Sequence, residues 1–453
     1  MSNTLRIANA QAFWGDDGQA AADLLRRDPT IDYITLDYLA EVSMSILAKQ
    51  QRRDPEYGYP RDFPDVIRSV APFWKAGCAT RLIANAGGLA PRQCALACER
   101  ILRDAGCQGK KIGIVSGDDV LSRLQAQPQD PLYHHLETGE PLGDRAAELL
   151  TANAYTGAAG IVTALEAGCD LVITGRVADP SMVVAPCVHE WGWSLDEYDR
   201  LAGATVAGHL IECGTQVTGG VSTQWLELED IANIGYPIVE VAANGDCVVT
   251  KLTETGGAVN VRTVKEQLLY ELGNPDSYLS PDCTVSFLSL HVEQVGHDRV
   301  AVRGATGTPP PATRKVSATH PAGFQATGNL VVFGEQAVLK AQRAGAAVLD
   351  RLRSRQRAPA ESRIECLGAG AAVPLPHLAR DDAREVVLRV SVADPVRSCV
   401  AQFAADWMSL VCSGPQGTTG YAGGRPRVSE TYAFWPCLTD AADIDTTVEV
   451  RVV

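Results

Sequence analysis

The strongest constraint on the fold is a regular alternation of two kinds of segment in the first half of the sequence. Short apolar runs rich in β-branched residues recur there, namely LRIANAQAFW, DYITLDYL, ATRLIANAGG, KKIGIVSGDD and CDLVITGR. Between them lie longer segments with helical periodicity, such as GQAAADLLRRD, AEVSMSILAKQQRR and PRQCALACERILRDAG. Strands that alternate with helices form βαβ units, whose parallel strands are covered by the helices. We therefore expect an N-terminal α/β domain over residues 1–225, with a Rossmann-like, mostly parallel sheet and flanking helices.

The pattern changes at about residue 226. YPIVEVAANGDCVVTKL contains two strand-like runs around Asn244-Gly245, a dipeptide typical of β-hairpin turns, and CTVSFLSLHVEQVGHDRVAVRG looks like a second strand pair. Helices are predicted at residues 335–353 and 396–411, with the strand EVVLRVSV between them and a terminal strand TTVEVRVV. This mixture predicts a smaller α+β domain over residues 226–453. The proline-rich stretch TGTPPPATRKVSATHPAG is expected to be a loop, either mobile or covering a substrate.

Composition excludes several classes of protein. The formal net charge of −14 argues against a nucleic-acid partner or an anionic membrane. The N-terminus has no signal-peptide pattern, and no apolar run reaches the roughly 18 residues of a membrane span. The 13 cysteines form no CxxC pair, so buried free thiols in a reducing compartment are expected. We predict a cytoplasmic protein without a membrane partner, and a homo-oligomer on the base rates for enzymes of this size.

Carboxylates follow two of the predicted strands. Asp37 closes one strand and Glu41 lies one helical turn further on, so the two could converge as an acid/base pair or on a divalent ion. Asp118 and Asp119 end another strand and suit magnesium-like coordination, although helix capping also explains Asp119. The turns after parallel strands gather at the carboxyl edge of the sheet, where ligands bind in such folds. We expect the functional site at this edge.

Other strand-end turns favour an anion. Asn85, Gly87 and Gly88 precede a helix, so their backbone could approach a ligand beside the positive end of the helix dipole. Arg176 is a natural carboxylate or phosphate clamp, and Asp179 could pair with it or share the binding role. Neither the GxGxxG fingerprint nor a Walker A lysine loop occurs, so the sequence has no NAD or ATP fingerprint.

A later helical segment, GHLIECGTQVTGG, adds His209, Glu212 and Cys213. His209 and Glu212 are three residues apart and share a helix face. A lone histidine is more often a satisfied structural group than a catalyst, and Cys213 would need a nearby base to act as a nucleophile. Lys251, followed by Thr255–Gly257, is a weaker candidate for a second anion site.

Together, these motifs resemble one family. GDDGQAA, YITLDYLAEVSMSIL, RLIANAGGLAP, IGIVSGDDV, GCDLVITGRVADPSMVVAP, GHLIECGTQVTGG, YPIVEV and TVKEQLLYELG are similar to the acyclic terpene utilisation protein AtuA and its relatives. The resemblance covers most of the chain and thins over the proline-rich stretch. It implies a place in the catabolism of compounds such as citronellol and geraniol, which runs through acyl-CoA thioesters with carboxylation and hydration steps. Around Lys251 the sequence KLTETGGAVN lacks the proline-glycine-threonine run expected in relatives, which argues against an anion site there.

The residues and the resemblance together favour an enzyme that acts on a small carboxylate or an acyl-CoA thioester. The expected reaction is hydration or dehydration by a hydro-lyase, or isomerisation, and the pathway of the family is the reason to prefer a hydro-lyase. The predicted acid/base residues are Asp37, Glu41, Asp118, Asp119 and Glu212. Whether a divalent cation bound by Asp118 and Asp119 assists this chemistry is left open by the sequence. The alternatives are a non-catalytic acyl-binding or assembly subunit, a hydrolase, and a phosphate-dependent transferase.

Overall fold

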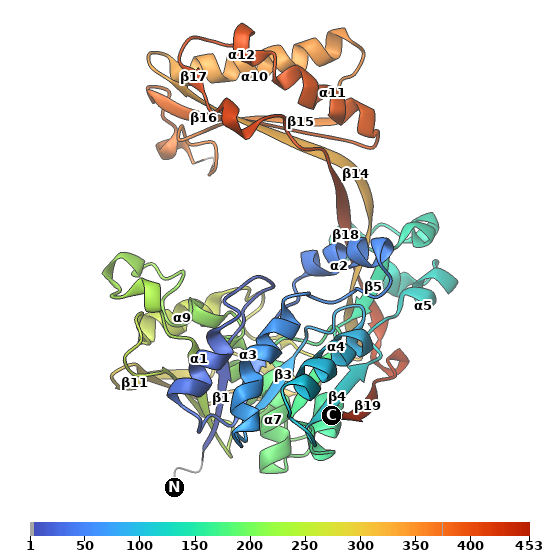
Figure 1. Cartoon of the computed structure of the whole chain (residues 1–453), viewed down its shortest axis with the longest axis vertical. Helices are drawn as coiled ribbons and strands as arrows, with labels where there is room; N and C mark the ends of the chain where they lie inside the picture. The colour runs from blue at the N-terminus through green and yellow to red at the C-terminus, as the bar shows by residue number, and fades with distance from the viewer. Residues whose placement is uncertain (1–3, 374) are drawn as a thin grey trace. The chain divides into compact units, whose positions relative to one another are not determined.

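The computed structural model of the chain describes residues 4–373 and 375–453 (Figure 1). The chain forms two compact units, unit 1 with residues 1–319 and 434–453 and unit 2 with residues 320–433. It passes from unit 1 to unit 2 within strand β14 (Thr313–Phe333) and returns within strand β18 (Ser429–Asp440). The chain is thus divided elsewhere than at the predicted boundary of residue 225, because the strands after this residue extend the sheet of the first half.

Unit 1 is built on a mixed sheet whose centre consists of the five strands that the sequence predicted. They run parallel in the order β1-β2-β3-β6-β4. Their bounds are β1 Thr4–Asn9, β2 Tyr33–Leu36, β3 Arg81–Ala84, β4 Lys111–Ser116 and β6 Leu171–Thr174. Consecutive residues of these strands enter different cores, since Tyr33 and Ile34 pack on opposite sides, as do Ile83 and Leu82. The α/β class predicted from the alternation is therefore confirmed.

Antiparallel strands extend both edges of this sheet. The predicted hairpin at Asn244-Gly245 joins β7 to β8, and β7 pairs with β1. The second strand pair forms the hairpin of β11 and β12, and the terminal strand β19 pairs with β4. The bounds are β7 Pro237–Ala242, β8 Cys247–Lys251, β11 His291–Gly296, β12 Arg299–Arg303 and β19 Thr447–Val452. These hairpins are the reason that residues beyond 225 belong to unit 1.

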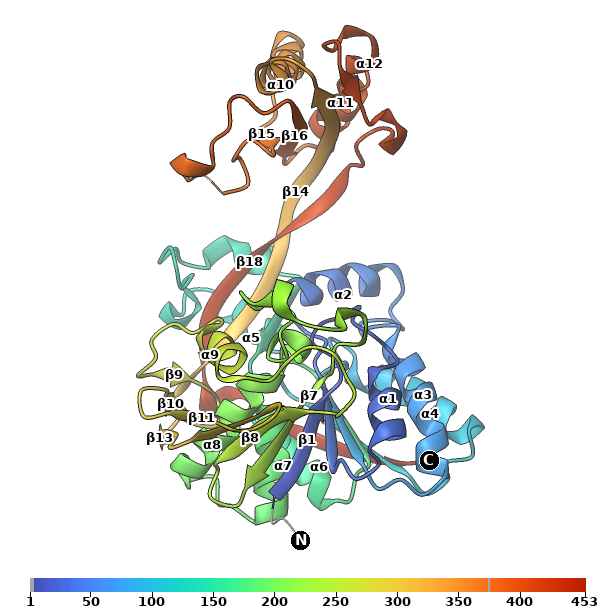
Figure 2. The ribbon, with the colours of Figure 1, turned by 90° about the vertical axis from the view of Figure 1, so that its left-hand side faces the viewer.

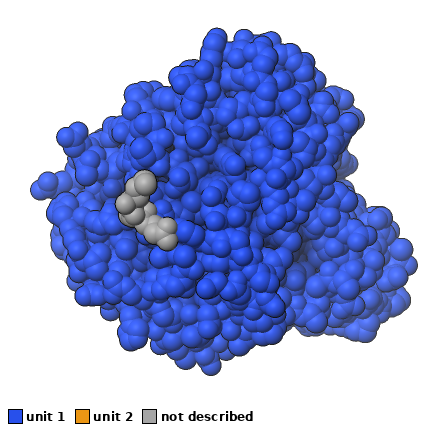
Figure 3. All heavy atoms as spheres, turned by 90° about the horizontal axis from the view of Figure 1, so that it is seen from below, with its two compact units in different colours: residues 1–319, 434–453 blue, residues 320–433 orange. Residues whose placement is uncertain are grey.

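Helices cover both faces of the sheet (Figures 1 and 2). One face carries α1 Ala20–Arg27, α3 Phe63–Lys75 and α4 Pro91–Asp104, and the other carries α6 Ala159–Glu166, α7 Ser181–Trp191 and α8 Tyr198–Ile211. The remaining helices of unit 1 are α2 Glu41–Arg53, α5 Leu121–Ala126 and α9 Val261–Leu269. Figure 3 shows the surface of one face of this unit. No helix in the described part of the chain is long and apolar enough to cross a membrane.

Strand β14 corrects the loop predicted from the proline-rich stretch. From Thr313 onwards this stretch is a β-strand, and it pairs antiparallel with the short β5 (Thr151–Ala154). Val316 and Ala318 are fully buried in this pairing. Prolines lack the N–H group that a central strand needs, but the run of three prolines ends before the strand, and Pro321 lies between the residues that pair with β5 and those that pair with β16. A small sheet of β9 Tyr278–Leu279, β10 Thr284–Ser286 and β13 Thr306–Thr308 precedes β14 in the chain.

Unit 2 is an antiparallel sheet covered by helices. Its strands follow the order β15-β16-β14-β17, and α10 and α11 pack on them through a core that includes Leu388, Val390 and Phe403. The predicted strand EVVLRVSV is β16, and the two predicted helices are α10 and α11 with α12. The bounds are α10 Ala337–Ser354, β15 Glu361–Leu367, β16 Glu385–Asp394, α11 Arg397–Trp407, α12 Leu410–Ser413 and β17 Thr418–Thr419.

The turn after β4 in unit 1 packs closely against the backbone before β19, and a substitution can test this contact. Gly117 has φ +119°, and a Cβ there would lie 2.1 Å from the carbonyl oxygen of Asp445. Gly109 also has a positive φ, +84°, but has open space around it. Gly117→Ala is therefore expected to lower the free energy of unfolding by about 3 kcal/mol or more, and Gly109→Ala by about 1–2 kcal/mol. Urea denaturation of both variants measures the difference, and equal losses would contradict the close approach at Gly117.

Candidate active site

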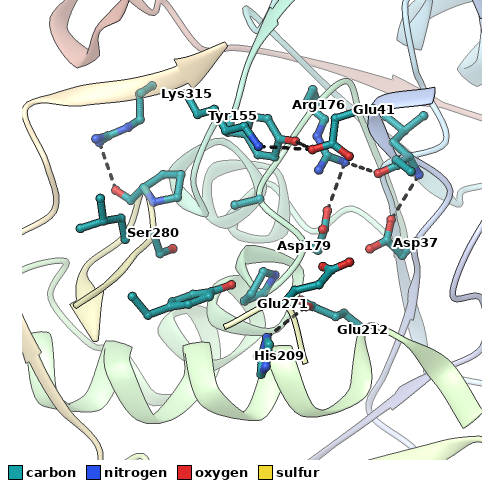
Figure 4. A pocket seen from close by; sticks show the side chains of 18 of the residues that line it. Asp37, Glu41, Tyr155, Arg176, Asp179, His209, Glu212, Glu271, Ser280 and Lys315 are labelled. Carbon is teal, nitrogen blue, oxygen red and sulfur yellow. Dashed lines mark hydrogen bonds and ion pairs between the residues drawn. The ribbon is translucent and has the colours of Figure 1, made fainter. Parts of the chain in front are cut away.

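A cavity of about 600 Å³ opens at the carboxyl edge of the parallel strands, a volume typical of small-molecule sites. It is formed within unit 1 by the turns after β1, β2 and β6, the end of α8, the segment around β9, and the start of β14. Its polar side chains are Asp37, Glu41, Tyr155, Arg176, Asp179, His209, Glu212, Tyr270, Glu271, Tyr278, Ser280, Thr313, Arg314 and Lys315. Figure 4 shows most of them converging on this space. The cavity therefore lies where the topology of the sheet predicts a ligand site.

Asp37 is almost completely buried, with 5% of its surface exposed. Its Oδ1 accepts hydrogen bonds from the side-chain amide of Asn85 at 2.7 Å and from the backbone of Leu39 at 3.2 Å. Burial raises the pKa of Asp37 to about 7, with a contribution from the charge of Glu212, while Arg176 and the hydrogen bonds act in the opposite direction. Asp37 is thus a carboxyl group that changes its protonation state near neutral pH.

Glu41 has the opposite electrostatic environment. Its Oε1 accepts a hydrogen bond from the Tyr155 hydroxyl at 2.7 Å and lies 3.3 Å from the Lys315 ammonium group. Burial alone would raise its pKa, but the hydrogen bonds and the charges of Arg176 and Lys315 outweigh burial and lower the pKa to about 2. Glu41 also stands in the first turn of α2, where the helix dipole favours an anion. It is therefore ionised throughout the neutral range.

Arg176 is the central cation of the cavity, with 3% of its surface exposed. Its Nη1 donates to the carbonyl oxygen of Leu39 and lies 3.2 Å from Oδ1 of Asp179, and its guanidinium stacks 4.2 Å from the Tyr155 ring centroid. Burial opposes the charge of Arg176, yet the surrounding acids outweigh burial and raise its pKa. Burial beside these acids also raises the pKa of Asp179. Arg176 thus already has a carbonyl, a carboxyl group and an aromatic ring of the protein as partners.

His209 and Glu212 form a second ionisable pair at the end of α8. Nε2 of His209 lies 3.0 Å from the Gln267 carbonyl oxygen and must carry a hydrogen to bond it, while Nδ1 lies 3.3 Å from Oε1 of Glu212. Gln267 also donates to the His209 carbonyl at 2.9 Å, which fixes the helix end. Burial lowers the pKa of His209, but Glu212 and the Gln267 carbonyl outweigh it, so its pKa is raised. The raised pKa favours the protonated form of the His209 ring.

Several buried polar atoms of the cavity have no hydrogen-bond partner within the described chain. Those that also lie outside the ion pairs described above are Nε of Arg176, Oε2 of Glu212 and Oγ of Ser280. Buried polar atoms are normally satisfied, and orphans are rare in folded proteins. Three such atoms around one cavity indicate that a polar ligand or ordered water completes their bonding.

Comparison with known proteins identifies the family. The family model described as acyclic terpene utilisation family protein AtuA matches residues 5–450, which is nearly the whole chain. The chain belongs to the AtuA family. No curated protein and no solved structure matches it. Membership in the AtuA family implies a role in acyclic terpene utilisation and leaves the reaction to be inferred from the site.

The structure brings five of the sequence-predicted residues of this AtuA-family protein to one cavity. They are Asp37, Glu41, Arg176, Asp179 and Glu212. Asn85 lies behind Asp37 and orients it instead of facing the cavity. Asp37 and Glu41, which the strand-end pattern placed together, therefore share one site, and their catalytic role stays a prediction.

Gly87 and Gly88 take a packing role in the structure. A Cβ on Gly87 would lie 2.4 Å from the carbonyl of Thr174, and a Cβ on Gly88 would lie 2.6 Å from that of Gly58. Neither glycine lines the cavity. Because these glycines have no side chain, other backbone segments of the protein pack directly against them. The space that a ligand would need is therefore occupied, and the two glycines are not placed to form the anion clamp predicted for them.

Asp118 and Asp119 do not fit the divalent cation that the sequence left open. Oδ2 of Asp118 accepts from the backbone of Arg176 and from the Asn153 amide, both at 2.8 Å, and burial raises its pKa to about 6. Asp119 accepts from the backbone of Leu121 at 3.0 Å, as a helix-capping residue does. Over residues 4–373 and 375–453, no three acidic, histidine or cysteine side chains are placed to share a metal ion. Asp118 supports the turn of Arg176 from behind the cavity.

Sequence patterns missed the far wall of the cavity. Tyr155 follows the four-residue strand β5, and Arg314 and Lys315 begin β14 within the stretch that was expected to be a loop. Ser280 and Tyr278 lie around the two-residue strand β9. Such short strands carry no periodicity. The only signal was the basic pair Arg314-Lys315, separated by two residues from the proline run.

The raised pKa of Asp37 predicts a pH-dependent stability. Because its pKa is higher in the folded protein than in the unfolded chain, folding loses stability as pH rises from about 4 to about 7. Asp37→Asn removes this loss, so relative to the wild type it should gain roughly 1–3 kcal/mol of unfolding free energy between pH 4 and pH 8.

Urea denaturation across this pH range measures the effect, with the exposed Asp196→Asn as the matched control. If Asp37→Asn and the wild type differ by a constant amount at every pH, Asp37 does not titrate as the site requires.

Proposed function

We propose that this AtuA-family protein is an enzyme that acts on a small carboxylate or an acyl-CoA thioester by acid/base catalysis, with hydration or dehydration as the favoured reaction. The observation that carries the proposal is the pair of carboxyl groups in one cavity whose pKa values are displaced in opposite directions, to about 7 for Asp37 and about 2 for Glu41. Two carboxyl groups with divergent pKa values mark an acid/base assignment in known enzymes.

Asp37 is the proton-transfer group in this proposal. A general acid or base works best when its pKa lies near the working pH, which holds for Asp37 and not for Glu41. In the hydration direction, the Asp37 carboxylate takes a proton from water as the oxygen adds to an unsaturated carbon. In the reverse direction the protonated Asp37 gives this proton to the departing hydroxyl group.

Glu41 has an orienting role. Its ionised carboxylate accepts a hydrogen bond from the Tyr155 hydroxyl and attracts the Lys315 ammonium group. Glu41 therefore fixes both side chains at the cavity wall. The tyrosine in turn lies against the guanidinium of Arg176. The His209–Glu212 pair is the second proton carrier, available to protonate the substrate carbon that gains charge when water adds.

The state of the cavity thiol supports acid/base chemistry over covalent catalysis. Burial raises the pKa of Cys213, with Glu212 adding to the effect, so the thiol is protonated at neutral pH. A thiol nucleophile requires the opposite shift. Addition and removal of water need carboxyl groups and no nucleophile, and hydration belongs to the acyl-CoA chemistry implied by acyclic terpene utilisation.

The proposal predicts turnover that depends on Asp37. With a panel of branched 2-enoyl-CoA thioesters and 2-enoic acids, each offered with its own 3-hydroxy counterpart, the wild type should interconvert at least one pair, and Asp37→Asn should lower kcat by about 100-fold or more. In the hydration direction, kcat/KM of the wild type should rise with pH to a plateau above about 7, since the carboxylate is the base, and this limb should be missing in the variant.

Asp196→Asn serves as the control and should retain wild-type kinetics. Turnover that survives Asp37→Asn unchanged would contradict the assignment of Asp37. Tight binding of an acyl-CoA without turnover of any member of the panel would favour the acyl-binding subunit instead.

A further inference from the structure

Arg314 is a cation of the cavity wall without an acidic partner. Its guanidinium is half-buried and forms no ion pair with any described residue. Instead Nη1 donates to the carbonyl oxygens of Pro311 at 2.6 Å and Thr313 at 3.2 Å, and Nη2 donates to that of Pro281 at 3.1 Å. These bonds fix the position of the guanidinium without neutralising its charge.

The hydrogen bonds of Arg314 leave part of the guanidinium available. An arginine has five N–H groups, and its three bonds within the described chain leave at least two of them without an acceptor. The nearby acid Asp282 does not fill this gap, because its oxygens accept from the backbone of Ala158 at 2.7 Å and from the Ser181 hydroxyl at 2.5 Å. Partial burial lowers the pKa of Arg314, but an arginine stays charged at neutral pH.

Ser280 gives a second, independent indication of a ligand at this corner. Only 4% of its surface is exposed, and its Oγ lines the cavity without a hydrogen-bond partner in the described chain. Ser280 directly precedes Pro281, whose carbonyl anchors Arg314, so the hydroxyl and the guanidinium belong to one corner of the wall. Figure 4 shows Ser280 on the side of the cavity away from Asp37 and Asp179. An unpartnered donor and an unpaired cation thus share this corner.

We propose that Arg314 and Ser280 bind a carboxylate group of the substrate. A guanidinium with two free N–H groups matches the two oxygens of a carboxylate, and the serine hydroxyl adds a third donor. The acids on the other side of the cavity repel a carboxylate, so only one orientation of the substrate is favourable. Resting on the proposed function, this inference selects substrates that carry a free carboxylate at a distance from the carbon that reacts at Asp37.

Calorimetric titration of the full chain tests the inference with hexanoate, its neutral isostere hexanamide, and inorganic phosphate as probes. We expect the wild type to bind hexanoate more tightly than hexanamide. Arg314→Gln should weaken hexanoate binding about 10–100-fold, and Ser280→Ala about 3–10-fold, with hexanamide binding unchanged. The exposed Arg262→Gln removes the same charge elsewhere and should leave hexanoate binding within about 2-fold of the wild type.

Equal binding of hexanoate and hexanamide by the wild type, absence of hexanoate binding, or wild-type affinity in both cavity variants would overturn the inference. Tighter binding of phosphate than of hexanoate, weakened by Arg314→Gln, would show a phosphate site and overturn the carboxylate assignment. If circular dichroism shows that Arg314→Gln does not fold, hexanoate binding by Ser280→Ala decides whether the inference holds. Asp37→Asn separates the two proposals, because it should lower kcat by about 100-fold or more and retain hexanoate binding.

Discussion

The site depends on one buried arginine. Arg176 neutralises acids that the carboxyl ends of the strands bring together, through its ion pair with Asp179 and its charge near Asp37 and Glu41. Buried carboxylates without a cation would be strongly destabilising, so the acid cluster can exist only around this guanidinium. The turn that presents Arg176 is fixed from behind by Asp118, which accepts its backbone N–H. The acid cluster at this edge is therefore a consequence of how β4 and β6 lie side by side.

Much of this arrangement follows from local sequence patterns. The alternation of short β-branched runs with helical segments predicted all five parallel strands, because buried parallel strands need continuous apolar residues. The strand-end rule then placed Asp37, Glu41, Arg176 and Asp179 at one edge, and they line one cavity. It could not distinguish a residue that faces the cavity from one that supports it. Asn85 and Asp118 end strands as Asp37 does, yet each bonds a neighbouring turn instead.

The far wall of the cavity depends on contacts between distant parts of the chain. Pairing of β5 with β14 joins residues 151–154 to residues 316–319, and this pairing carries Tyr155 and Lys315 to Glu41. A four-residue strand has too few positions for a period to be seen, and the prolines before β14 concealed its start. The boundary at residue 225 failed to match the two units for a similar reason, since the pairing of β7 with β1 is also long-range. Local patterns predict elements, whereas long-range pairing decides which elements share a site.

The assignment of the site rests on two carboxyl groups in one cavity that have opposite protonation behaviour at neutral pH. Carbon-13 NMR of the wild type with labelled aspartate and glutamate side chains, assigned through Asp37→Asn and Glu41→Gln, follows each group directly during a pH titration. The opposite displacement of the two pKa values predicts a transition near pH 7 for Asp37 and no transition above about pH 3 for Glu41. Two transitions close to pH 4, the range of exposed carboxyl groups, would contradict it.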